Sequence, residues 1–283
     1  MDLTENIKMK NKIIATDLDR TLLPNGHHPV NKDAMKIFKN LLKERNFILV
    51  FVTGRNKELI ERGIKKYSLP TPDFCVSSVG TVSYEIKNGK FFEIKEWQEF
   101  IKKHSKNFSC KKVRVLLKNL QIKEQPKKVN NPFKQSYFIK LDKNNESTLG
   151  KIKEILGKEM SDAEIVYSID SKKNLGLVDV VPKFANKIHA LKFLMKKLKV
   201  NSENILYAGD SGNDILPITS GLHSVLVKNA SHDIKEAIQQ IAKQKLIEKD
   251  VYIAKGSFEI NGKVLNGNYV SGIIEGLNWI GWI

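Results

Sequence analysis

Cysteine is scarce in this chain. Only two of its 283 residues are cysteines, Cys75 and Cys110, and neither belongs to a Cys-x-x-Cys pair. Two isolated cysteines exclude a disulfide framework and favour reduced thiols in a cytoplasmic protein. The chain also lacks any apolar run near the roughly 18 residues that a membrane span needs. Residues 1–12 are polar and mixed in charge, so we expect neither a signal peptide nor a membrane partner.

Acidic residues are few relative to basic ones. The chain has 31 Asp and Glu against 48 Lys and Arg, which gives a formal net charge of +17 at pH 7. An excess of this size favours an anionic partner, such as nucleic acid, an anionic membrane or a phosphorylated small molecule. The lysines are spread along the whole chain, so a solvated basic surface is the simpler interpretation, and we expect no nucleic-acid partner.

Short apolar segments alternate with amphipathic helical patterns at the start of the chain. Residues 13–15 and 47–52 are predicted to be buried strands, because they are short and unbroken by polar residues. Asn31 and Asn56 stand where they can cap the helices that follow these strands. Strand, helix, strand, helix is the order of a parallel sheet with crossover helices, so the sequence predicts an α/β fold with a Rossmann-like core.

The pattern changes near the Asn88-Gly89 dipeptide, which is typical of a two-residue β-hairpin turn. Beyond it the segments favour an antiparallel α+β insertion, and a parallel pattern returns with a strand expected at residues 177–181. We therefore expect a core of residues 1–88 and 178–283 with an inserted α+β domain of residues 89–177. Within the insertion, the expected strands are residues 113–117, 120–122, 137–141 and 165–167, and the expected helices are residues 96–104 and 146–156.

Four polar motifs lie at predicted strand ends or helix starts. Asp17 and Asp19 follow the first strand, and Thr53 follows the second. Lys187 opens a helix, and the Gly-Asp-Ser-Gly-Asn-Asp segment at residues 209–214 follows a further predicted strand. Each motif alone is common in turns, but their conjunction is not. Because ligands bind outside the carboxyl ends of the strands in open α/β sheets, we expect these side chains to meet in one crevice.

The crevice would collect four carboxylates, those of Asp17, Asp19, Asp210 and Asp214. Two like charges ~4 Å apart repel by about 4 kcal/mol at an effective dielectric constant of ~20, so either the carboxyl pKa values rise or a cation binds. Hard oxygen ligands select Mg²⁺, and no His or Cys cluster indicates zinc. Positive charge there can neutralise a phosphate, and carboxylates are nucleophiles toward phosphorus. The residues therefore predict Mg²⁺-assisted chemistry on a phosphate.

The order Asp-x-Asp-x-Thr, Thr, Lys and Gly-Asp-x-x-x-Asp resembles the motif set of the haloacid dehalogenase-like (HAD) hydrolases. The inserted α+β region resembles the type IIB cap of that superfamily. Further segments resemble its sucrose-phosphate phosphatase-like branch, and they are residues 53–55, 78–81, 132–137, 209–214 and 272–277. The resemblance covers nearly the whole chain.

The resemblance implies catalytic roles for four residues. Asp17 would attack phosphorus and form the aspartyl-phosphate. Asp19 would protonate the leaving sugar oxygen and then deprotonate the attacking water. Thr53 and Lys187 would hold the phosphate oxygens. Dehalogenases of the superfamily lack the second aspartate, so Asp19 favours a phosphatase or a phosphomutase.

The resemblance also implies the metal ligands. Asp210 would bind Mg²⁺ together with Asp17 and the carbonyl of Asp19. Asp214 would be a further ligand, directly or through water, or would orient Lys187.

The residues expected to bind the sugar phosphate are Gly54, Arg55, Asn213, Lys134, Gln135, Tyr137 and Asn229. The first three lie in or beside the motifs, the next three lie in the inserted domain, and a purely structural role is the alternative for those three. Arg20 stands where many relatives have Gly or Asn, and it either adds positive charge near the phosphate or points away.

We therefore expect a cytoplasmic, Mg²⁺-dependent phosphatase that acts on a small-molecule sugar phosphate, with sucrose 6-phosphate or a related disaccharide phosphate favoured. Trehalose, mannosylfructose, glucosylglycerol and amino-sugar phosphates are alternative substrates, and a phosphomannomutase-like enzyme is an alternative activity. A non-catalytic module that binds a sugar phosphate or nucleic acid is the alternative of a different class. The intact Asp17, Asp19 and Lys187 argue against such a module, whereas nucleic-acid binding with a steep salt dependence would favour it.

Overall fold

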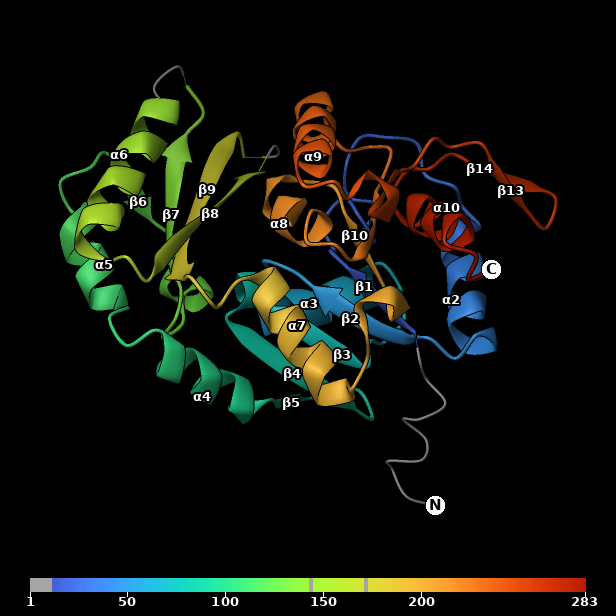
Figure 1. Ribbon diagram of the computed structural model, residues 1–283, viewed down its shortest axis with the longest axis horizontal. Coiled ribbons are helices and arrows are strands. Elements are labelled where there is room, and N and C mark those ends of the chain that lie inside the picture. The colour runs from blue at the N-terminus through green and yellow to red at the C-terminus, as the bar shows by residue number, and fades with distance from the viewer. Residues whose placement is uncertain (1–11, 143–144, 171–172) are drawn as a thin grey trace.

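The computed structural model describes residues 12–142, 145–170 and 173–283, so most of the N-terminal segment considered above lies outside the described residues. An eight-stranded sheet forms the centre of the larger part of the molecule (Figure 1). The sheet is parallel from β12 to β3, while β4 and β5 add an antiparallel edge. In spatial order its strands are β12 (Val251–Ile253), β11 (His223–Leu226), β10 (Ile205–Gly209), β1 (Ile13–Thr16), β2 (Ile48–Val52), β3 (Phe74–Ser77), β4 (Val82–Lys87) and β5 (Lys90–Glu93). The predicted α/β fold class is confirmed.

Helices cover both faces of this sheet. Alternate residues of a strand point to opposite faces, so Ile14 and Phe51 pack in one core while Ile13 and Val50 pack in the other. The first face carries α2 (Ala34–Glu44), α3 (Lys57–Lys66) and α10 (Val270–Trp279). The second carries α4 (Lys95–His104), α7 (Lys187–Leu198), α8 (Ile215–Ile218) and α9 (His232–Gln244). A hairpin of β13 (Phe258–Ile260) and β14 (Lys263–Leu265) extends beside α10 (Figure 1).

The two predicted helix caps have different outcomes. Asn56 caps α3 as expected, because its Oδ1 accepts a hydrogen bond from Leu59 N at 3.1 Å. The prediction for Asn31 is wrong, since the residue that precedes the first turn of α2 is Asp33. Asn31 Oδ1 instead accepts from Asn266 N at 2.8 Å, a partner 235 residues away in the sequence. A tertiary contact therefore takes the place of the local cap.

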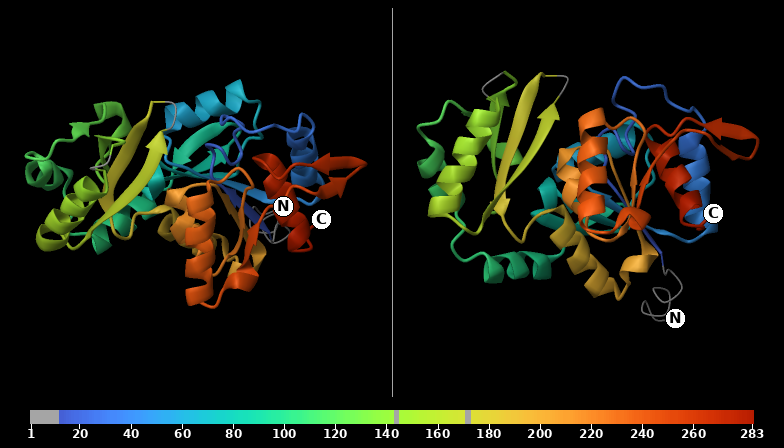
Figure 2. Two further views of the ribbon diagram at one scale, coloured as in Figure 1. Left: turned by 90° about the horizontal axis from the view of Figure 1, so that it is seen from above. Right: turned by 45° about the horizontal axis from the view of Figure 1, so that its top comes forward.

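A second, smaller layer is built on an antiparallel sheet, and we call it the cap (Figure 2). Its strands, in spatial order, are β6 (Lys123–Glu124), β7 (Gln135–Lys140), β9 (Leu175–Pro182) and β8 (Ala163–Asp170). Two helices, α5 (Cys110–Leu117) and α6 (Asn145–Glu159), pack on one face, where Val113, Leu156 and Val178 share a separate core. The other face of the cap sheet looks toward the large sheet.

Two expected strands of the insertion are wrong. Residues 113–117 belong to α5, which Ser109 caps by accepting a hydrogen bond from Lys112 N. Val113 and Leu117 are four residues apart, so both are buried on one face of this helix. Residues 120–122 precede the short strand β6 and are not part of it. A five-residue apolar segment fits both a strand and a helix turn, so its pattern alone does not separate the two.

The strand expected at residues 177–181 exists, but it lies in the cap and not in the parallel sheet. It is part of β9, which is antiparallel to both β7 and β8. A central strand is covered on both faces, so its apolar run resembles that of a buried parallel strand.

Two observations bear on the expected domain boundaries. Residue 89 lies within the β4–β5 hairpin of the large sheet, and Trp97 and Ile101 of α4 pack against that sheet. We therefore propose that the cap begins after α4 and ends with β9. No helix among the described residues is long and apolar enough to cross a membrane.

Candidate active site

The predicted strand-end motifs meet at the carboxyl edge of the large sheet. β1 lies between β2 and β10, and all three are parallel, so the residues that follow them leave the sheet side by side. Asp17 follows β1, Thr53 follows β2 and Asp210 follows β10. Asp17 N donates to Ala208 O at 2.9 Å, which extends the sheet pairing into the loop. Lys187 reaches the same place from the first turn of α7.

Three buried carboxylates gather at this edge. One oxygen from each of Asp17, Asp210 and Asp214 lies within 4.8 Å of the others. Burial raises the pKa of Asp210 to about 7 and the pKa of Asp17 well above its ordinary value, and the Asp214 carboxylate adds to both shifts. A divalent cation would offset the repulsion, and an all-oxygen donor set suits Mg²⁺. The residues present therefore fit the metal that the sequence predicts.

Lys187 is held within this cluster. Its Nζ donates to Asp17 Oδ1 at 3.0 Å, to Asp214 Oδ1 at 2.7 Å and to Asn213 Oδ1 at 2.7 Å. Burial alone would lower the pKa of Lys187, but the two carboxylates outweigh burial and hold the pKa above its ordinary value. Lys187 is therefore a charged group beside Asp17, where it can neutralise an anionic phosphate.

Asp214 is surrounded by hydrogen-bond donors. Its Oδ1 also accepts from Tyr207 OH at 2.6 Å, and its Oδ2 accepts from the backbone N–H groups of Asp210 and Ser211 at 3.1 and 3.2 Å. Gly209 makes room for this carboxylate, because a Cβ at residue 209 would lie 2.5 Å from Asp214 Cγ. Of the roles expected for Asp214, this geometry favours orientation of Lys187 over direct ligation of a metal.

Asp19 is paired with Arg55 at the edge of the cluster. Arg55 Nη2 and Nε donate to the two carboxylate oxygens at 2.6 and 2.7 Å, and Asn25 Nδ2 donates to Oδ1 at 2.6 Å. Burial would raise the pKa of Asp19, but the hydrogen bonds and charge of Arg55 outweigh burial and lower the pKa. The side chain is therefore held as a carboxylate.

A cavity of about 530 Å³ opens between this edge of the sheet and the cap, and its volume is within the range of small-molecule sites. From the core it is lined by Asp17, Asp19, Arg20, Gly54, Arg55 and Asn213. From the cap it is lined by Lys134, Phe138 and Asp179, among others. The cavity thus brings together the nucleophile expected from the sequence and four of the expected substrate-binding residues, Gly54, Arg55, Asn213 and Lys134.

Comparison with known proteins agrees with this geometry. A family model described as sucrose-6F-phosphate phosphohydrolase matches residues 10–281. The chain belongs to this sucrose-phosphatase family. Among its relatives, a HAD-like hydrolase of Nitrosococcus oceani is 34% identical over 95% of this chain and 72% of its own length. Sucrose-phosphatase 1 of Nicotiana tabacum is 31% identical over 78% of this chain.

The family's solved structures confirm the fold. The chain is similar to the X-ray structure of the Synechocystis sucrose-phosphatase in complex with sucrose and phosphate, with a TM-score of 0.78 and 21% identity. That similarity covers 96% of this chain and 98% of the other. In contrast, this chain spans about half the length of the plant sucrose-phosphatases, 51% in the case of the tobacco protein. The predicted family is confirmed by the match over residues 10–281.

Two cap residues expected to bind the sugar are placed elsewhere. Gln135 and Tyr137 alternate with Phe138 along β7, so they leave the strand on the face opposite the cavity that Phe138 lines. Tyr137 is 3% exposed and lies in the core that the cap sheet shares with α5 and α6. The motif at residues 132–137 therefore contributes Lys134 to the cavity wall, whereas Gln135 and Tyr137 are not among the described residues that line the cavity.

Asn229 also lies outside the lining that the structure describes for this cavity. Its Nδ2 donates to Arg20 O at 2.7 Å, and its Oδ1 accepts from Tyr269 N at 2.7 Å. It therefore supports the loop that carries Asp19 and Arg20, and its expected contact with substrate is replaced by a structural one.

Reasoning from the sequence missed Asp179 and Tyr207. Asp179 Oδ1 accepts from Ser136 Oγ at 2.5 Å and lies 3.5 Å from Lys134 Nζ. All three residues are buried, and Lys134 and Asp179 line the cavity. Tyr207 lies in β10 and donates to Asp214. The signal for each was a single polar side chain in an otherwise apolar strand, because buried polar groups need partners.

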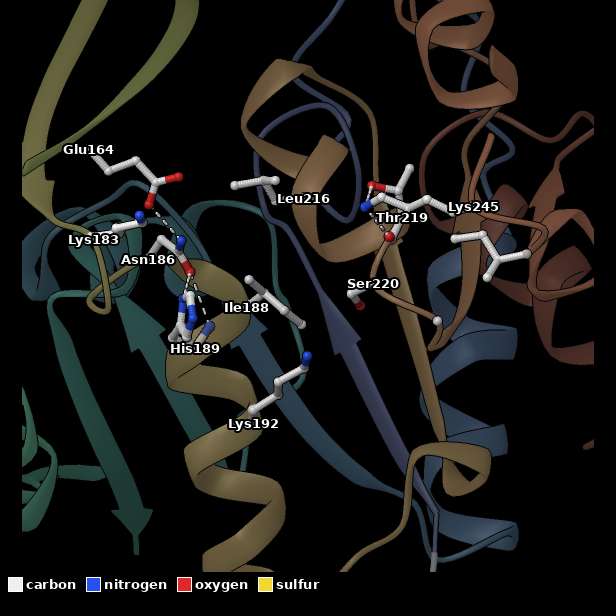
Figure 3. A pocket seen from close by; sticks show the side chains of 12 residues that line it. Glu164, Lys183, Asn186, Ile188, His189, Lys192, Leu216, Thr219, Ser220 and Lys245 are labelled. Atoms are coloured by element: carbon white, nitrogen blue, oxygen red, sulfur yellow. Dashed lines mark hydrogen bonds between the residues drawn. The ribbon is translucent and has the colours of Figure 1, made fainter. Parts of the chain in front are cut away.

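A second cavity, also of about 530 Å³, lies beside α7 (Figure 3). None of the clustered carboxylates lines it. On the side of α7, Asn186 Oδ1 accepts from His189 N at 3.0 Å, and Asn186 Nδ2 donates to Glu164 Oε2 at 2.7 Å. Glu164 belongs to β8 of the cap. This contact therefore links the cap to the residue that precedes Lys187.

Proposed function

We propose that the protein is a Mg²⁺-dependent phosphatase that hydrolyses a sugar phosphate, with sucrose 6-phosphate or a related disaccharide phosphate favoured. The observation that carries the proposal is Asp17, a buried carboxylate that is paired with Lys187 and lines a cavity of ligand size. Family membership supports the phosphatase activity, and the name of the tobacco relative supports the favoured sugar.

The proposed reaction has two steps. In the first, Asp19, once released by Arg55, takes a proton from solvent. An Asp17 oxygen then attacks phosphorus, the bond between phosphorus and the sugar oxygen breaks, and Asp19 gives its proton to the sugar oxygen. In the second, Asp19 takes a proton from water, the water oxygen attacks phosphorus, and inorganic phosphate leaves the Asp17 carboxylate. Lys187 and the Thr53 hydroxyl stabilise the phosphoryl oxygens in both steps.

The pairing of Asp19 with Arg55 bears on the first step. A carboxylate that accepts two hydrogen bonds from a guanidinium is a poor proton donor, because the pair stabilises its ionised form. We expect Arg55 to release Asp19 when the substrate fills the cavity that both residues line. The released guanidinium can then bind a phosphate or sugar oxygen.

Asp17, Asp210 and the Asp19 carbonyl are the groups we expect to hold Mg²⁺. The bound ion would supply positive charge to the phosphoryl oxygens during transfer. Asp214 would contribute by keeping Lys187 in place, as its contacts with Lys187 and Tyr207 suggest.

The cap wall would select the sugar. Asp179 offers carboxylate oxygens that accept from sugar hydroxyls, while Lys134 and Ser136 offer donors, and all three are already buried. A site of this kind discriminates strongly, because a substrate without the matching hydroxyl leaves buried polar groups unpaired.

Phosphate release from a panel of sugar phosphates tests the proposal. The panel includes sucrose 6-phosphate and the alternatives named above, each assayed with Mg²⁺, with a chelator, and with Asp17→Asn. Asp233→Asn is the matched control, because it makes the same change at an exposed residue in the first turn of α9.

We expect strong release from one disaccharide phosphate that requires both Mg²⁺ and Asp17 and survives Asp233→Asn. Broad, weak release that is lost in Asp17→Asn would keep the mechanism and remove the favoured sugar. Isomerisation of a hexose phosphate without phosphate release would favour the phosphomannomutase-like alternative. Release that is unaffected by Asp17→Asn would contradict the mechanism.

A further inference from the structure

Arg20 has an unusual backbone conformation in the loop between the two motif aspartates and Thr21. Its φ of 59° lies in the left-handed region, which favours glycine and asparagine and is uncommon for other residues. Two side-chain contacts hold the backbone there: Arg20 N donates to Asn25 Oδ1 at 2.8 Å, and Arg20 O accepts from Asn229 Nδ2 at 2.7 Å. These two hydrogen bonds hold the backbone of residue 20 in the left-handed region, although an arginine there is strained.

The side chain of Arg20 points at the metal-site carboxylate Asp210. Its Nε lies 3.1 Å from Asp210 Oδ2, while Thr21 Oγ1 donates to Asp210 Oδ1 at 3.2 Å. Lys187 donates to Asp17 and Asp214 instead. Within the described residues, Arg20 is therefore the cationic group that forms an ion pair with Asp210.

The two partners differ in their freedom to move. The Asp210 side chain is 2% exposed, whereas the Arg20 side chain is 35% exposed and lines the cavity. The guanidinium can therefore leave Asp210 toward the cavity while the carboxylate stays in place. A guanidinium and a divalent cation compete for the same negative charge, because each is stabilised by it and each repels the other.

We propose that Arg20 is a tethered counter-ion that occupies Asp210 before Mg²⁺ binds and that Mg²⁺ must displace. The inference rests on the proposed function, since Asp210 is a metal ligand only if that proposal holds. It follows that Arg20 weakens Mg²⁺ binding and that its neutral replacement strengthens it. The phosphate of a bound substrate would be a further anionic partner for the displaced guanidinium.

Calorimetric titration of Mg²⁺ into the substrate-free protein of residues 1–283 tests the inference. Arg20→Gln removes the charge while keeping a long polar side chain. Arg20→Asn is the second variant. Asparagine tolerates the left-handed region, so this variant should fold even if Arg20→Gln does not. Arg62→Gln is the matched control, since Arg62 is exposed and lines the same cavity from α3.

We expect both Arg20 variants to lower the Mg²⁺ dissociation constant by about three- to fivefold, as loss of one partly exposed ion pair implies. Arg62→Gln should leave the Mg²⁺ dissociation constant unchanged within about twofold, because it breaks no ion pair with a buried carboxylate. As a second readout, the Mg²⁺-induced rise in unfolding temperature at a fixed Mg²⁺ concentration should be larger in the Arg20 variants.

Equal or weaker Mg²⁺ binding in both Arg20 variants would overturn the inference while leaving the proposed function intact. Equal tightening in Arg62→Gln would also overturn it, because the effect would then come from the overall charge of the cavity. Binding of Mg²⁺ by the Arg20 variants alone would support it in its strongest form. Absence of Mg²⁺ binding from every protein would overturn both the inference and the proposed metal site.

Discussion

Arg55 binds both carboxylate oxygens of Asp19, with Nη2 2.6 Å from Oδ1 and Nε 2.7 Å from Oδ2. Asp19 is the residue expected to exchange protons with the sugar oxygen and with water. In the substrate-free protein it is held in an ion pair and is not a free acid. The pair lies at the wall of the cavity that the substrate would enter. We therefore expect substrate entry and proton transfer to be coupled through this guanidinium.

Loss of this pair should change the pH dependence of stability. Arg55 lowers the pKa of Asp19 from its ordinary value of 3.8, against an opposing effect of burial. A carboxyl whose folded pKa is lowered adds stability above its unfolded pKa, and that stability is lost as the pH falls through the folded pKa. Arg55→Gln should therefore lower the unfolding temperature most near about pH 6, with a difference from wild type that shrinks below about pH 4.

Thermal unfolding from acidic to neutral pH in a chelating buffer measures this difference. Arg62→Gln serves as the control, because it removes an arginine from the same cavity wall. A difference between Arg55→Gln and wild type that stays constant across the whole pH range would contradict the role of the pair in setting the Asp19 pKa.

Tyr207→Phe should weaken the support of Lys187. It removes the hydroxyl that donates to Asp214 Oδ1 at 2.6 Å, and hydrogen bonds to charged groups contribute about 1.5–3 kcal/mol. Tyr252→Phe is a matched control, because Tyr252 OH donates to Glu275 Oε1 at 2.7 Å at a site remote from the cavity. We expect both variants to unfold at lower temperature, but only Tyr207→Phe to lower kcat/KM several-fold. Equal kcat/KM in the two variants would show that Tyr207 has a structural role alone.

The affinity for Mg²⁺ should rise with pH. Burial raises the pKa of Asp210 to about 7, so part of this carboxyl is protonated near neutrality in the metal-free protein. Its folded pKa lies above the unfolded value, so metal-free stability falls as the pH rises from about 4 to about 7 and the buried charge forms. Mg²⁺ binds the ionised form and should raise the unfolding temperature more at about pH 8 than at about pH 5.5. An equal rise at both pH values would argue against Asp210 as a ligand.

Asp179→Asn should impair recognition of the sugar more than catalysis. Asp179 accepts from Ser136 in the cap wall, away from the phosphoryl group that Asp17 attacks. We expect KM for the best sugar phosphate to rise by about tenfold with a smaller change in kcat. Tyr137→Phe is the control, since the buried Tyr137 hydroxyl has no hydrogen-bond partner among the described residues. A larger effect of Tyr137→Phe than of Asp179→Asn would restore Tyr137 as a sugar contact.

The carboxyl edge of the sheet could be predicted from the sequence because it follows from a local rule. Each short apolar run ends in a polar motif, and parallel strands bring those ends together wherever the helices between them lie. The sequence alone therefore predicts that Asp17, Lys187 and Asp210 lie together, and the structure places them at this edge, with Thr53 following the neighbouring strand β2. The α/β core is predictable for the same reason, since strand and helix patterns alternate on both sides of the insertion.

The cap was harder to predict, because its decisive contacts are not local. Alternate residues of β7 point to opposite faces of the cap sheet, and the register of β7 with β9 decides whether Tyr137 or Phe138 faces the cavity. Residues 113–117 form a helix because Ser109 caps it and the cap sheet covers one of its faces. The pairing of Arg55 with Asp19 joins residues 36 positions apart, and neither motif alone indicates it.

The central claim is that phosphate is transferred to Asp17, and trapping of the phosphorylated enzyme tests it most directly. The enzyme would be mixed rapidly with the best sugar phosphate carrying labelled phosphorus, quenched in acid and mapped by peptide. The account predicts label on the peptide that contains Asp17, released by hydroxylamine as expected of an acyl phosphate, and no label in Asp17→Asn. Turnover with no labelled protein, or with label on a peptide that lacks Asp17, would contradict it.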